Sequence, residues 1–125
     1  MNFIKHVANS RNIKVYCDDN EAIKKALGNT DFYKNGQLSA DGYAVDYHNL
    51  ENPIVLFKRE ADKEKRRFTI AHELGHIFAG HLSFEDSKGN SDLRELEASM
   101  IGAVLFGLSI YEEYKNSQAE EGVLA

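Results

Sequence analysis

The order of apolar and polar positions divides the first forty residues into short elements. Apolar residues at helical spacing near the N-terminus predict a short helix over residues 2–10. Residues 13–17 alternate between apolar and other side chains, which is the pattern of a half-buried strand. A polar break follows and favours a second short helix over residues 21–27. Residues 31–42 are polar and contain two glycines, so we expect a loop there.

Two more strands are expected before the longer helices. Residues 43–47 again alternate, and residues 48–52 resemble a hairpin loop. Residues 54–57 are Ile-Val-Leu-Phe, apolar on both faces, and this is typical of a strand at the centre of a sheet. The pattern therefore predicts a sheet of about three strands.

Two helices complete the predicted domain. Asp62 is a suitable N-cap for a helix over residues 63–79, which Gly80 would end. The charged run 58–67 is expected to be solvated. A second helix begins near Asp92, and one of its faces collects large apolar residues, which we expect to form its core face: Leu93, Leu96, Met100, Ile101, Val104 and Leu108. Residues 109–118 would add a last amphipathic turn or two, and residues 119–125 would fray.

Composition narrows the class of protein. A chain of 125 residues with 42% hydrophobic and 28% charged residues is an ordinary single globular domain over residues 1–125. A net charge of −5 disfavours a nucleic-acid partner. The N-terminus lacks the apolar run of a signal peptide, and no run is long enough for a membrane span. The single cysteine, Cys17, fits a reducing compartment, so we expect a cytoplasmic protein.

The sequence His-Glu-x-x-His at residues 72–76 supplies the chemistry. On a helix, His72 and His76 share one face and can bind one zinc ion. Glu73 is rotated by about 100°, so it would lie beside the metal and could accept a proton from an activated water molecule. Two imidazoles are too few ligands, so the motif predicts a third protein ligand and an open position.

The helix that begins near Asp92 contains two candidate acids for that third position. At about 100° per residue, Glu97 falls within the large apolar arc, whereas Glu95 falls on the opposite side. A carboxylate on a core face is costly unless it is paired or binds a metal. We therefore expect Glu97 to be the ligand, with a buried salt bridge to Arg67 or Arg94 as the alternative. Two acids of the polar loop rank lower: Glu85 and Asp86.

A third histidine ligand is another way to complete the site. In one class of metallopeptidases the motif continues His-Glu-x-x-His-x-x-Gly-x-x-His. Here Leu82 occupies the position of the third histidine, and His81 stands one place before it. On a continuing helix His81 would point away from the histidine pair, so we interpret it as an outer or surface group that could touch substrate.

A longer stretch resembles a known family. Arg67-Phe68-Thr69-Ile70-Ala71-His72-Glu73-Leu74-Gly75-His76, the later His81 and the segment Glu95-Leu96-Glu97-Ala98 are similar to the ImmA/IrrE family of metallopeptidases. The resemblance implies an α+β, zincin-like fold in which the sheet packs against the His-Glu-x-x-His helix and a second ligand-bearing helix. It also implies His72, His76 and Glu97 as zinc ligands and Glu73 as the catalytic acid and base.

The resemblance also implies a function. Members of this family carry out regulated cleavage of a protein, often the repressor of a prophage or other mobile element. A zinc endopeptidase acting on a transcriptional repressor is therefore our hypothesis. The alternative is a zinc-containing regulatory protein that captures a repressor or a toxin-system partner without cutting it. Candidate donors to the reacting carbonyl oxygen, or contacts to substrate, are His81, Tyr43, Tyr47, His48 and Tyr111.

Overall fold

The computed structural model describes residues 2–27, 29–30, 33–34, 37–38, 40–46, 52–59, 62–82 and 91–124. The described elements are, in order, α1 (Asn2–Ser10), β1 (Lys14–Cys17), α2 (Glu21–Leu27), β2 (Asn29–Thr30), β3 (Tyr33–Lys34), β4 (Gln37–Leu38), β5 (Gly42–Val45), β6 (Ile54–Phe57), α3 (Lys63–Phe78) and α4 (Ser91–Leu124). The predicted α+β class is confirmed. Most of the expected hairpin loop at 48–52 lies outside the described residues, as do Glu85 and Asp86.

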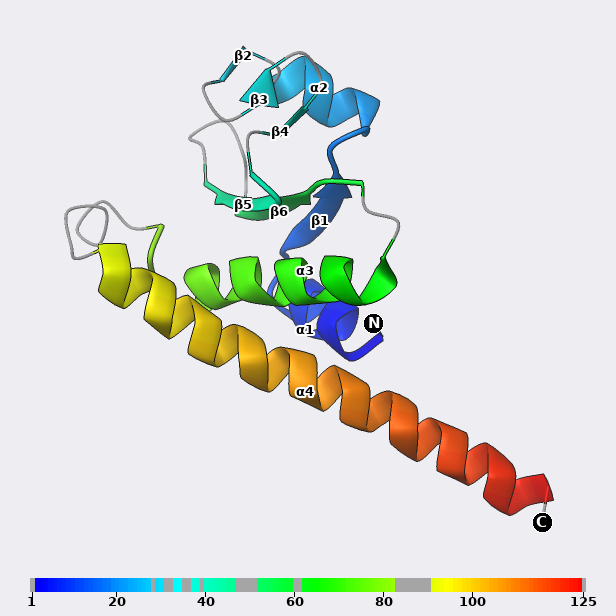
Figure 1. Cartoon of the computed structure of the whole chain (residues 1–125). Coiled ribbons are helices and arrows are strands. Elements are labelled where there is room, and N and C mark those ends of the chain that lie inside the picture. The colour runs from blue at the N-terminus through cyan, green and yellow to red at the C-terminus, as the bar shows by residue number, and fades with distance from the viewer. Residues whose placement is uncertain are drawn as a thin grey trace.

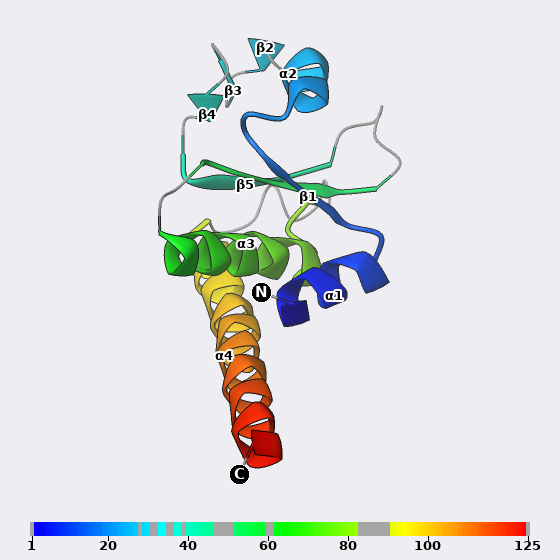
Figure 2. The same ribbon diagram turned by 90° about the vertical axis from the view of Figure 1, so that its right-hand side faces the viewer.

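The main sheet has three strands in the order β1-β6-β5. β6 is central as predicted: it runs parallel to β1, with Val15 opposite Val55, and antiparallel to β5, with Ala44 opposite Val55. Figure 1 shows this sheet between α3 on one face and α2 with the small strands on the other, and Figure 2 shows the same layers from the side. Consequently both faces of β6 are buried, which accounts for its unbroken apolar run.

The two faces of β6 belong to two apolar clusters. Val55 packs with Ile70 and Leu74 of α3, and α1 and Leu105 of α4 complete this first cluster. Ile54 and Leu56 point to the other face, where they meet the second cluster, which α2 and β3 to β5 supply. The alternation of side chains along a strand thus connects the two halves of the domain.

The segment expected to be a loop, residues 31–42, contains two short strands. β2, β3 and β4 form a second, antiparallel sheet of three strands. Tyr33 and Leu38 are its buried anchors, and the Tyr33 hydroxyl donates a hydrogen bond to the carbonyl oxygen of Asp18. Two apolar residues are too few for a visible alternation, so the polar composition of the segment concealed these strands.

The helix α3 begins and ends close to the predicted residues. The side chain of Asp62 accepts a hydrogen bond from the backbone N–H of Glu64 at 2.9 Å, which is the expected N-cap. Gly80 has φ 78°, and the backbone N–H of His81 donates to the carbonyl of His76 at 3.0 Å. This six-residue closure is a Schellman motif, and it turns the chain back over the last turn of the helix.

The expectation that residues 58–67 are solvated is wrong at Arg67. This side chain is 1% exposed and forms ion pairs with Glu113 of α4 and, at 3.8 Å, with Glu64. The hydrogen bond from the guanidinium holds the pKa of Glu113 below its usual value. The buried guanidinium of Arg67 therefore connects α3 to α4 through its ion pair with Glu113.

The segments 91–108 and 109–118 are parts of a single helix of 34 residues, α4. Figure 1 shows that α4 crosses beneath α3 and extends beyond it toward the C-terminus. Fraying of residues 119–125 stays a prediction. None of the described helices is both long and apolar enough to cross a membrane.

Candidate metal centre

The helix α3 directs two imidazole rings at one carboxylate. His72 Nε2 lies 3.0 Å from Glu95 Oε2, and His76 Nε2 lies 3.2 Å from Glu95 Oε1. One ligand atom from each of the three side chains lies within 4.8 Å of the other two. Two imidazole nitrogens and one carboxylate oxygen are a donor set that suits a catalytic transition-metal site with an open position. These residues therefore fit a metal ion.

A close crossing of two helices delivers Glu95 to this point. A Cβ atom added to Gly75 of α3 would lie 2.4 Å from the carbonyl oxygen of Ala98, and one added to Gly102 would lie 2.9 Å from the Cα atom of His72. Contacts this short require glycine. Since Glu95 precedes Ala98 by about one helical turn, the crossing places its carboxylate over the histidine pair.

The structure brings Glu95, and not Glu97, to the histidines. Glu97 lies with its Oε1 atom 3.7 Å from His81 Nε2. The helical-wheel argument correctly set the two acids on opposite sides of α4, but it assumed that the larger apolar arc faces the core. The buried arc consists instead of small or medium side chains: Ala98, Gly102, Leu105 and Ser109. Met100 and Val104, near Glu97, are each 62% exposed.

Each metal-facing ring also has a contact at its other nitrogen. His76 Nδ1 lies 2.9 Å from His81 Nδ1, and His72 Nδ1 lies 3.5 Å from Ser99 Oγ. Such outer contacts orient a metal-binding imidazole and select its tautomer. His81 reaches His76 because the chain turns back at Gly80, whereas a continuing helix would have carried it away. Its buried position matches an outer role.

Burial shifts the pKa values of His76 and Glu73. Burial lowers the pKa of His76, although the nearby Glu95 opposes the shift. A lowered pKa favours the neutral ring, which is the form that binds a metal. Burial raises the pKa of Glu73 to about 7, and the negative charge of Glu95 adds to the shift. A carboxylate with a pKa near neutrality is suited to exchange protons with a reacting group.

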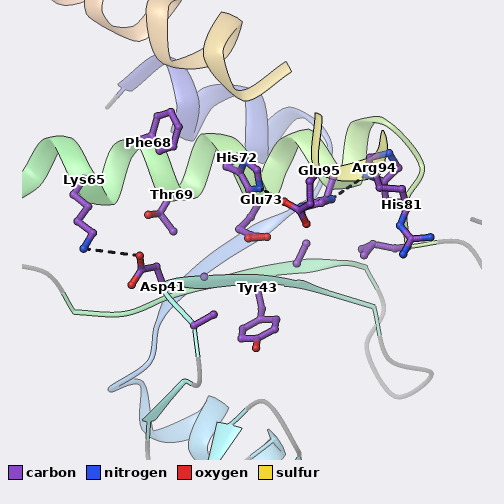
Figure 3. Close-up of a pocket in the computed structure, with 15 residues that line it drawn as sticks. Asp41, Tyr43, Lys65, Phe68, Thr69, His72, Glu73, His81, Arg94 and Glu95 are labelled. Carbon is purple, nitrogen blue, oxygen red and sulfur yellow. Dashed lines mark hydrogen bonds and ion pairs between the residues drawn. The ribbon is translucent and has the colours of Figure 1, made fainter. Parts of the chain in front are cut away.

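The strand β5 lies directly over Glu73. A Cβ atom added to Gly42 would lie 2.6 Å from Thr69 Cγ2 and 3.2 Å from Glu73 Cγ, so only glycine permits this approach. Figure 3 shows the Glu73 carboxylate in the space between α3 and β5, next to His72. Gly42 therefore buries the acid from one side while the metal-binding rings stand at its other side.

The centre opens into a cleft of about 690 Å³. One wall is α3, the opposite wall is the edge strand β5, and the Glu95 end of α4 contributes to the lining. Phe68 and Arg94 lie in this lining and were not among the predicted contacts to substrate. The sequence contained a signal for both residues. Phe68 precedes His72 by one helical turn, and Arg94 is the residue before Glu95, so each lies close to a candidate metal ligand in the chain.

The remaining candidate residues do not contact the metal-binding rings in the described part of the chain. Tyr43 projects from the opposite face of β5 (Figure 3) and packs against the second apolar cluster. Tyr111 is exposed on α4, sixteen residues beyond Glu95, which is about 24 Å along a helix. Tyr47 and His48 lie outside the described residues. Of the predicted contacts, His81 touches a metal-binding ring, and Tyr43 is part of the β5 lining of the cleft.

Of three comparisons with known proteins, one gives a match. Neither the curated proteins nor the solved structures give a significant match. The model of the Peptidase_M78 family, described as the IrrE N-terminal-like domain, matches residues 25–118. The matched region contains all four residues of the centre, His72, Glu73, His76 and Glu95, and both helices that carry them. The chain therefore belongs to the Peptidase_M78 family, a metallopeptidase family that includes the IrrE-like proteins.

Proposed function

We propose that the protein is a zinc-dependent endopeptidase in which His72, His76 and Glu95 hold the metal. The observation that carries this proposal is the convergence of three ligand atoms within 4.8 Å beside a buried glutamate. A purely structural zinc site is normally closed by four protein ligands. Three converging ligands at the edge of a cleft leave room for a reacting group.

Glu73 is the group that moves the proton. When bound, zinc supplies Lewis-acid polarisation of a carbonyl group and makes a water molecule easier to deprotonate. The Glu73 carboxylate accepts the proton from the attacking water and afterwards returns it to the leaving amine. In the metal-free protein, burial raises the pKa of Glu73 to about 7, so neither the acid nor the base form of this side chain is scarce at neutral pH.

The edge of β5 is the proposed contact for the substrate backbone. β5 pairs with β6 along one edge only, within the described sheet, and it forms a wall of the cleft. An extended peptide can add to such an edge through main-chain hydrogen bonds, which place few demands on sequence. Phe68 is 48% exposed on the facing helix and offers an apolar surface to a substrate side chain.

A regulatory protein, such as the repressor of a phage or mobile element, is the proposed substrate. The support for this class is the family assignment together with the open cleft beside β5. Capture of such a partner without cleavage is the competing hypothesis. It needs neither a buried acid beside the metal ligands nor a raised pKa, and for this reason we favour cleavage.

Substitution of Glu73 by glutamine separates the two hypotheses. Zinc-loaded wild type and Glu73→Gln are incubated with a library of synthetic peptides and co-expressed with candidate repressors, and the products are identified by mass spectrometry. We expect internal cleavage by wild type, a rate lower by about 10²–10⁴ in the variant, and equal zinc content in both. Equal relief of repression by both proteins without any fragments would instead establish capture.

A further inference from the structure

The outer face of α4 carries a long apolar stripe, which Glu97 interrupts near its N-terminal end. Seven large residues form this outer seam, and each is 43% to 62% exposed: Leu93, Leu96, Met100, Val104, Leu108, Tyr111 and Tyr114. They recur every three or four residues, with a mean spacing of 3.5, which is typical of a helix that packs lengthwise against another helix. The seam spans 21 residue steps, or about 32 Å of helix.

Six residues of the seam, from Leu96 to Tyr114, belong to neither apolar cluster of the described residues. The buried arc of α4, which includes Ala98 and Gly102, faces α3 on the opposite side. Figure 1 shows that the C-terminal part of α4 extends away from the body of the domain. Large apolar side chains exposed along one helix face are typical of an interaction surface.

The size of the seam suits a dimer. Seven side chains that each expose about half of their area offer roughly 700 Å² per copy, which approaches the roughly 800 Å² that each partner gives to a standard interface. The sequence of the seam is also nearly symmetric about Val104. Met100 and Leu108 lie four residues to either side, and the outer pairs Leu96 with Tyr111 and Leu93 with Tyr114 match within one residue.

We propose that two copies of this chain associate through the outer seam, with their α4 helices antiparallel about a twofold axis at Val104. In this arrangement Met100 of each copy packs on Leu108 of the other, and each end of the seam meets the opposite end of its partner. A twofold contact of this kind is isologous, which means that both copies use the same surface. A nearly symmetric stripe therefore packs against an identical stripe of the partner.

The charges beside the seam favour the antiparallel orientation. Glu97 and Lys115 are 18 residues apart, which is five full turns of a helix, so they flank the same side of the seam. Antiparallel helices place this flank against the same flank of the partner. Each Glu97 then lies within about four residues of the register of the partner's Lys115, an offset of about 6 Å that the two long side chains span.

A parallel pair would not use these charges. It would set the flank of Glu97 and Lys115 against the other flank, where the helix carries Ala103 and Gly107. The two ion pairs form only when the helices run in opposite directions. Charge therefore selects one orientation, while the apolar seam supplies most of the buried surface.

The mass of the protein in solution is the first test. Interfaces of standard size have dissociation constants from about micromolar to picomolar, so light scattering at about 1–100 μM should give wild type twice the chain mass of 14.1 kDa. Val104→Glu places two carboxylates at the twofold axis and should weaken association at least 100-fold. Asn116→Glu is the control, since Asn116 is also exposed but lies about 120° around the helix from Val104, on the side of the buried arc. It should remain dimeric.

Orientation is tested by cysteine pairing and by charge exchange. In a Cys17→Ser background, a mixture of Met100→Cys and Leu108→Cys chains should form mixed disulfide dimers more readily than either variant alone. Lys115→Glu should weaken the dimer, and Glu97→Lys with Lys115→Glu should restore it. A monomeric wild type, a dimeric Val104→Glu with native circular dichroism, or preferential self-pairing of Met100→Cys would each overturn the proposal.

Discussion

The two long faces of α4 differ in the size of their side chains more than in polarity. The inner face, built on Ala98 and Gly102, is buried against α3, whereas the outer seam is more than two-fifths exposed at every position. Small residues let two helix backbones approach closely, and here the approach brings a carboxylate to a histidine pair. The face of α4 that positions the metal-binding carboxylate is therefore the face with the smaller apolar side chains.

The same comparison decides between two glutamates. Glu95 and Glu97 are two residues apart, about 200° around the helix, so they belong to opposite faces. Glu95 shares the inner side and contacts both histidines, while Glu97 borders the outer seam. Only the choice of packing face determines which acid can serve as a ligand.

The largest effect is expected from widening the inner face. Gly75→Val would direct a side chain into the Ala98 carbonyl, and no flexible neighbour can yield. We expect a loss of about 3 kcal/mol or more in the free energy of unfolding, measured by urea denaturation, together with loss of metal binding. Gly107→Ala is the control, because nothing lies within 4 Å of its added Cβ. It should be neutral or stabilise the helix by up to about 1 kcal/mol.

The burial of Glu73, near Glu95 on the inner side of α4, predicts how the free energy of unfolding changes with pH. In metal-free protein its pKa rises from 4.5 unfolded to about 7 folded, because burial disfavours the charged form. Its contribution to stability is therefore complete below pH 4.5 and is lost as pH rises through 7, at a cost of about 3 kcal/mol. Glu73→Gln removes this loss. With chelator present, the variant should gain about 3 kcal/mol relative to wild type between pH 4 and pH 8.

Two variants of α4 extend the pH test. Glu95→Gln should reduce the pH-dependent loss, since the charge of Glu95 contributes to the raised pKa of Glu73. Glu97→Gln, on the other face, should leave the loss unchanged. Identical pH profiles for wild type and Glu73→Gln would show that the acid is not buried in the manner described.

Metal affinity compares the two glutamates directly. Glu95→Ala removes a ligand and should weaken zinc binding by at least about 100-fold, more than the loss of an outer contact. Glu97→Ala should change the affinity by less than about 10-fold, since among the described residues Glu97 lies near His81 and not near the histidine pair. Competitive titration against a zinc chelator measures both. The reverse order of effects would assign the metal to the outer face.

The smallest expected effect comes from the outer contact of His76. His81→Phe keeps an aromatic ring in the buried site but removes the nitrogen that lies 2.9 Å from His76 Nδ1. Loss of such a contact lowers metal affinity by about 10–100-fold. We expect this decrease in the zinc titration with little change in the circular dichroism spectrum. An unchanged affinity would show that His81 serves only to fill space.

Local patterns in the sequence determined much of the fold. The N-cap at Asp62, the stop at Gly80, and the apolar run of residues 54–57 each depend on near neighbours, and the structure agrees with them. The spacing of His72 and His76 likewise requires only the helical repeat. These predictions succeeded because the relevant forces act within one or two turns of the chain.

Tertiary structure alone decided the features that depend on distant partners. The burial of Arg67 needs Glu113, 46 residues away, and the contact of His81 with His76 needs a backbone that turns back at Gly80. The choice of Glu95 over Glu97 needs the clearance that Gly75 leaves for Ala98. A helical wheel ranks faces by hydrophobicity, but it contains no information about how closely another helix can approach. That distance determines which carboxylate reaches the histidine pair.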